Sequence, residues 1–88
     1  MTIPISTDSI ISACIEGDRS AQKKLYVNYC DAMYTLAYRI TNNHELANDS
    51  LQDAFMEVFK NIKSYDGTGT IGSWIKTIVV RKAVKTIK

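Results

Sequence analysis

The chain has 88 residues, of which 45% are hydrophobic and 23% are charged, and its formal net charge is +2. This length suits one domain with a single small core, and the composition is typical of a globular protein rather than of a disordered or fibrous one. The longest aliphatic run near the C-terminal end, Ile78 to Val80, is too short to cross a bilayer, and the N-terminal "MTIPISTDS" lacks the basic start and apolar stretch of a secretory signal. We therefore expect a cytoplasmic protein that does not enter a membrane.

Charge is distributed unevenly along the chain. Residues 1–59 carry eight acidic and four basic side chains, whereas residues 60–88 carry seven basic side chains and one acidic one, Asp66. Segregation of this kind predicts that two parts of the surface bind two different partners. Solvated helix faces without a partner are the alternative.

Turn-forming residues divide the chain into four helical segments. These turn-forming residues are Pro4, Gly17, Asn42–Asn43 and the stretch "DGTGTIG". The first segment is expected over about residues 7–16, with Ser6 or Thr7 as its N-cap and Gly17 as its stop. Asp18 is expected to cap the second segment, which extends to about Thr41. The second segment has one helical apolar stripe, formed by Ala21, Leu25, Tyr29, Met33, Leu36, Ala37 and Ile40.

The third segment, "HELANDSLQDAFMEVFKNI", has two opposite faces, and Asn42 with Glu45 resembles a capping box at its start. Its core face is predicted to consist of Ala47, Leu51, Ala54, Phe55, Val58 and Ile62. The opposite face carries an acidic row, Glu45, Asp49, Asp53 and Glu57, with Gln52 and Met56 beside it. Like charges four residues apart destabilise an isolated helix slightly, so the row predicts a basic partner.

A glycine-containing loop, "SYDGTGTIG", precedes the last segment, with Thr68 or Thr70 as the next N-cap; it lacks the spacing of a phosphate-binding loop. The last helix has a wide apolar face beside a narrow basic stripe, formed by Trp74, Thr77, Arg81, Lys85 and Lys88. Cations in such a row can follow phosphates, and an aromatic ring at its head can meet an unstacked base. Packing against the core is the alternative role for Trp74.

These patterns together resemble one known family. "EGD" precedes a tyrosine-rich helix, "D-x-x-Q-D-x-F" lies in the acidic helix, and "S-W-I" opens the basic helix. In this order, over about residues 10–88, they are similar to region 2 of bacterial RNA polymerase sigma factors, most of all the extracytoplasmic-function (ECF) group. The resemblance implies an all-α bundle of three to four helices, with residues 1–88 as a single region 2 domain that lacks the helix-turn-helix domain, region 4. Whether the native protein continues into region 4 stays open.

The resemblance also assigns partners to particular residues. Asp49, Gln52 and Asp53, with Met56 beside them, would face the clamp helices of the polymerase β′ subunit. The loop and last helix would bind the melted non-template strand of the minus-ten promoter element, through Lys63, Ser64, Tyr65, Asp66, Trp74, Lys76, Thr77, Arg81 and Lys85. The family usually has asparagine where this chain has Arg81, and often aspartate or asparagine where it has Lys85. An anti-sigma factor is a further candidate partner.

Other functions receive less support from the sequence. A small helical regulator that binds proteins without recognising single-stranded DNA is the main alternative. Duplex binding by a helix-turn-helix is disfavoured because a glycine loop replaces the tight turn. We expect no enzyme and no cofactor, since His44 stands without a nucleophile or metal-ligand partner. Cys14 and Cys30 are expected to stay reduced in the helical interior.

Overall fold

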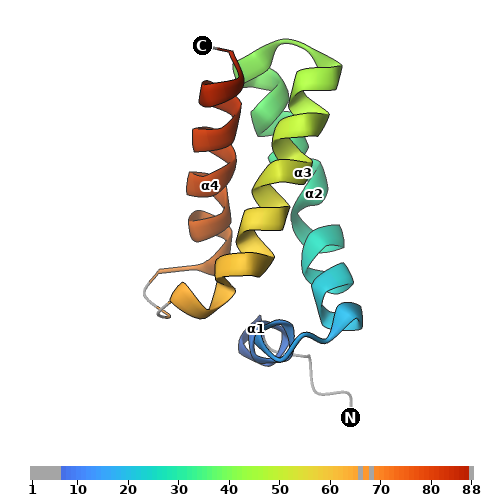
Figure 1. Cartoon of the computed structure of the whole chain (residues 1–88), viewed down its shortest axis with the longest axis vertical. Helices are drawn as coiled ribbons and strands as arrows, with labels where there is room; N and C mark the ends of the chain where they lie inside the picture. The colour runs from blue at the N-terminus through green and yellow to red at the C-terminus, as the bar shows by residue number, and fades with distance from the viewer. Residues whose placement is uncertain (1–6, 66, 68, 88) are drawn as a thin grey trace.

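The structure is a computed structural model that describes residues 7–65, 67 and 69–87. Its helices are α1 (Thr7–Ile15), α2 (Arg19–Thr41), α3 (His44–Asn61) and α4 (Ile71–Thr86), and a short 3₁₀ turn, η1 (Ile62–Ser64), follows α3. The three long helices run side by side along the long axis of the molecule, and α1 lies across one end of them (Figure 1). This confirms the predicted all-α bundle. The predictions for Ser6, Asp66, Thr68 and Lys88 lie outside the described residues.

Two of the predicted helix starts are confirmed by their capping bonds. The Asp18 carboxylate accepts hydrogen bonds from the backbone N–H groups of Ser20 and Ala21, at 2.9 and 3.2 Å, and so begins α2. At the start of α4, Thr70 Oγ1 accepts a hydrogen bond from the Ser73 N–H at 3.1 Å. Each cap satisfies N–H groups that have no partner within the helix.

The predicted capping box at Asn42 is wrong by one residue. Asn42 ends α2 in the left-handed conformation, with φ of 52° and ψ of 33°, and its N–H donates to the Tyr38 carbonyl. Asn43 is the N-cap of α3, and its side chain accepts a hydrogen bond from the Leu46 N–H at 2.9 Å. Two residues must stop one helix and start the next, and asparagine suits both tasks. Glu45 is therefore one position too early for a capping box.

The core lies between the helices and follows the predicted faces closely. Every residue of the predicted core face of α3 is buried. On α2 the agreement is partial, because Tyr29, Leu36 and Ile40 are only half-buried. Tyr29 borders the first turn of α4, where a Cβ atom built on Gly72 would lie 3.1 Å from its ring. Gly72 therefore lets α4 begin close to α2.

A hydrogen bond between the hydroxyls of buried Ser50 and exposed Thr86 joins α3 to α4, and the sequence patterns did not reveal it. Ser50 is only 1% exposed, and its Oγ lies 3.1 Å from Oγ1 of Thr86. The Thr86 hydroxyl donates to the Lys82 carbonyl at 2.8 Å, which leaves the Ser50 hydroxyl as the donor between the two side chains. A small polar residue can thus be buried here because its hydrogen bond is made.

The two cysteines are free, but only Cys14 lies in the helical interior that was predicted for both. Cys14 is 2% exposed, and burial, with a smaller contribution from the Asp18 carboxylate, raises the pKa of its thiol.

This difference predicts different rates of alkylation for the two cysteines. Cys30 is half-buried, and thiolate is the form of cysteine that reacts. At about pH 8 we therefore expect an alkylating agent to modify Cys30 rapidly and Cys14 only after unfolding in urea. Mass spectrometry of the modified peptides checks this. Rapid modification of Cys14 in the folded chain would contradict its burial.

Candidate functional site

The acidic row lies on the outer surface of α3, but half of it has a partner within the chain. Glu45, Asp49 and Asp53 are exposed, whereas Glu57 is partly buried. Arg81 and Lys82 of α4 both pair with Glu57, and Lys82 Nζ lies 3.2 Å from its Oε1 and 3.5 Å from Oδ2 of Asp53. A basic partner was predicted for the whole acidic row. For the C-terminal half of the row, Asp53 and Glu57, that partner lies within the same chain, on α4. Among the residues that the structure describes, Glu45 and Asp49 form no ion pair.

Lys82 was not predicted as a functional residue. Its ammonium group lies between Asp53 and Glu57, and the hydrogen bond to Glu57 contributes most to raising its pKa. Its position next to Arg81 was the signal in the sequence. A residue pattern along one helix, however, does not show which residues of a neighbouring helix a side chain contacts. Lys82 links the acidic row to α4 rather than presenting a free charge.

The residues predicted to face the polymerase share one exposed surface. Asp49, Gln52, Asp53 and Met56 are all exposed on α3, and Met56 is 71% exposed. Gln52 Nε2 donates to the Tyr26 hydroxyl at 3.0 Å, and that ring meets Phe55 edge-on with centroids 4.9 Å apart. Asp53 and Met56 also line an open hollow of about 270 Å³. An exposed methionine among polar side chains suits a protein interface.

The loop before α4 uses part of its predicted binding chemistry internally. The Tyr65 hydroxyl donates to the Gly69 carbonyl at 2.8 Å, and its ring packs against Trp74 with centroids 5.8 Å apart. Trp74 is half-buried against the core, in line with its alternative role in packing. Lys63 and Ser64 are exposed in η1, and Asp66 lies outside the described residues.

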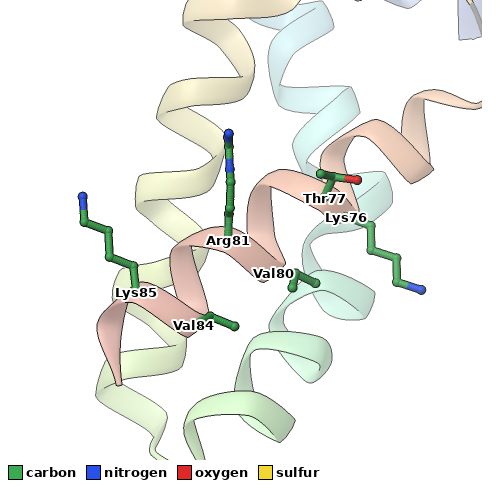
Figure 2. Close-up of a pocket in the computed structure, with 6 residues that line it drawn as sticks. All are labelled: Lys76, Thr77, Val80, Arg81, Val84 and Lys85. Carbon is green, nitrogen blue, oxygen red and sulfur yellow. The ribbon is translucent and has the colours of Figure 1, made fainter. Parts of the chain in front are cut away.

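Two parallel rows of side chains on α4 form an open hollow of about 600 Å³ (Figure 2). One row, Thr77, Arg81 and Lys85, is the part of the basic stripe that follows Trp74. The other row, Lys76, Val80 and Val84, adds a further cation and two half-buried valines. The structure thus brings the four predicted polar residues of this helix together. The valines were not predicted as part of the site, although they follow Lys76 at intervals of four residues, and this spacing was the available signal.

His44 contacts two tyrosines that the sequence-based argument did not consider. Its Nδ1 lies 2.5 Å from the Tyr34 hydroxyl, and its ring centroid lies 4.6 Å from that of Tyr38. The three rings pack together at the connection between α2 and α3. Within residues 7–65, 67 and 69–87, no group of three or more His, Cys, Asp or Glu residues is arranged to hold a metal ion. In the same ranges, no helix has the length and apolar character needed to cross a membrane.

Comparison with known proteins points to one family. Residues 25–88 match the family model of sigma-70 region 2. The ECF RNA polymerase sigma factor SigW of Bacillus subtilis is 30% identical over 73 residues, which cover 83% of this chain and 39% of that protein. SigE of Mycolicibacterium smegmatis, also named an ECF RNA polymerase sigma factor, is 34% identical over 65 residues, or 70% of this chain and 25% of that protein. This chain therefore spans less than half the length of these relatives. No solved structure matches it significantly.

Proposed function

This chain belongs to the sigma-70 region 2 family, in its ECF group, and we propose that it joins core RNA polymerase to a melted promoter strand during transcription initiation. In this proposal the exposed face of α3 binds the β′ clamp helices through Asp49, Gln52, Asp53 and Met56. The face of α4 and the preceding loop bind the non-template strand of the minus-ten element.

The observation that carries the proposal is the hollow on α4. Three cations, Lys76, Arg81 and Lys85, surround two valines there. Lys76 and Lys85 are nine residues apart, which corresponds to about 14 Å along a helix. Cations distributed over this length can neutralise successive phosphates, while the apolar floor can contact the bases of an unpaired strand. Thr77 donates its hydroxyl proton to the Ser73 carbonyl, so its oxygen is left as an acceptor.

The other residues proposed to bind the strand have supporting roles. Lys63 and Ser64 are exposed beside the loop, where they can meet a phosphate or a base edge. Tyr65 and Trp74 pack on each other, so they would form one wall of the site rather than two independent stacking platforms. Asp66 is proposed from the family resemblance alone.

The proposal predicts that the chain binds single-stranded DNA more tightly than duplex DNA. We expect Lys85→Gln and Lys76→Gln each to weaken strand binding about fivefold at about 0.1 M salt. Each should also reduce the salt slope, the steepness with which the logarithm of the binding constant falls with the logarithm of the salt concentration, by about 0.7, because each removes one phosphate contact. Fluorescence anisotropy with a labelled deoxyoligonucleotide over a range of salt concentrations measures both quantities. Lys24→Gln, an exposed lysine of α2, is the control for the same change in net charge.

The same experiment separates the proposal from its alternative. A protein-binding regulator without strand recognition would show no preference for single-stranded DNA, and its three lysine variants would behave alike. That result, obtained with a folded chain, would overturn the role of α4 in strand binding.

A further inference from the structure

The Arg81 side chain lines the strand-binding hollow proposed above, but its guanidinium is already paired with a carboxylate on α3. It pairs with Oε2 of Glu57 on α3, while Lys82 occupies Oε1 of the same carboxylate. Figure 2 shows the Arg81 side chain extending across toward α3, the yellow helix, whereas Lys76 extends to the other side of α4. Both oxygens of Glu57 are therefore engaged by cations of α4.

Glu57 and Arg81 stand where the two proposed surfaces meet. Arg81 lines the hollow on α4, and Glu57 lines the hollow beside Met56 on α3. Both residues, with Lys82 and Lys85, line a third hollow of about 250 Å³ between these helices. Arg81 therefore has two environments within reach, the carboxylate on α3 and the open face of α4.

The local environment favours the carboxylate when no nucleic acid is bound. The Glu57 side chain is only 26% exposed, so its charge is less screened by water than that of Asp53, which is 60% exposed. The Arg81 side chain is 64% exposed, so a phosphate can reach it, but only in competition with Glu57. Without Glu57, Lys82 would keep Asp53 as a partner, whereas Arg81 would keep no ion-pair partner among the described residues.

We propose that Glu57 is a positioning residue that masks the charge of Arg81, so that α4 presents chiefly Lys76 and Lys85 to a DNA strand. This inference rests on the proposed strand binding and concerns how much charge that surface displays. Glu57 thus lowers the affinity of the α4 face for the phosphates of any DNA strand. A preference for one strand over another then depends on the remaining contacts. The arginine that distinguishes this chain from the usual family pattern is mainly a link between α3 and α4.

A double-mutant cycle with a labelled oligothymidylate strand tests the masking. We expect Glu57→Gln to tighten strand binding about threefold to fivefold at about 0.1 M salt and to steepen the salt slope by about 0.7, the value of one added phosphate contact. Arg81→Gln should change binding little in the wild-type background and weaken it about threefold to fivefold in the Glu57→Gln background, so that the cycle closes with no Glu57→Gln effect once Arg81 is replaced. Glu45→Gln is the matched control, because it removes an exposed carboxylate of the same row that forms no ion pair with any described residue.

The possible outcomes are distinct. If the Glu57→Gln effect exceeds that of Glu45→Gln and disappears when Arg81 is also replaced, the masking is supported. If wild type binds the strand but Glu57→Gln and Glu45→Gln have the same affinity and salt slope, the masking is overturned while the proposed function stands. If neither wild type nor Glu57→Gln binds the strand, the proposed function itself fails, and the masking fails with it. Circular dichroism of each variant verifies that the helices are intact.

Discussion

Asp49→Lys is expected to abolish binding of this chain to a purified β′ clamp-helix fragment. Asp49 is exposed on α3, and none of the ion pairs within the described residues involves it, so its charge is available to a partner. Placing a like charge against a basic partner costs several kcal/mol, and we therefore expect affinity to fall by at least about 30-fold. Because the side chain is exposed, the melting temperature should change little. Calorimetric titration and a thermal melt measure the two quantities.

Controls connect this loss to one surface. Glu16→Lys makes the same charge reversal at an exposed position in the turn between α1 and α2, and it should retain binding. Gln52→Ala removes the amide held by Tyr26 and should weaken binding without reversing a charge. If Asp49→Lys binds as wild type does, the outer face of α3 is not the polymerase contact. If the variant instead unfolds, the acidic row is a structural feature.

Phe55→Ala is expected to cause the largest loss of stability. Phe55 is 3% exposed and lies between two aromatic rings, with centroids 4.9 Å from Tyr26 and 6.0 Å from Phe59. Replacing a buried phenylalanine with alanine costs about 3–5 kcal/mol, through lost transfer free energy and the cavity left behind. Small domains have a free energy of unfolding of only about 5–15 kcal/mol, so a large fraction of it would be lost. Urea denaturation followed by circular dichroism measures the change.

Phe59→Ala is the matched comparison for this prediction. Phe59 packs at the edge of the core and is half-buried, so the same substitution should cost roughly half as much. Equal losses in the two variants would contradict the assignment of Phe55 to the centre of the core. Phe55→Ala should also release Tyr26, which holds Gln52, so a loss of polymerase binding in that variant would not identify a contact.

The helices and their outer faces could be predicted from the sequence because the signals are local. The caps at Asp18 and Thr70 satisfy N–H groups two or three residues away, and the core face of α3 follows from helical periodicity alone. The same periodicity placed Thr77, Arg81 and Lys85 in one row. The misplaced cap at Asn42 shows the limit, because two adjacent asparagines offer equivalent local signals and only the path of the chain distinguishes them.

What the sequence by itself determined is therefore the number of helices, their approximate ends, and the direction in which each side chain points from its own axis. The tertiary structure alone decided which side chains meet across helices. Arg81 and Glu57 are 24 residues apart, and Ser50 and Thr86 are 36 apart. A pattern along one helix contains no information on the rotation and register of its neighbour, which depend on how the whole core packs. For this reason the acidic row could be found in the sequence, but its internal partner on α4 could not.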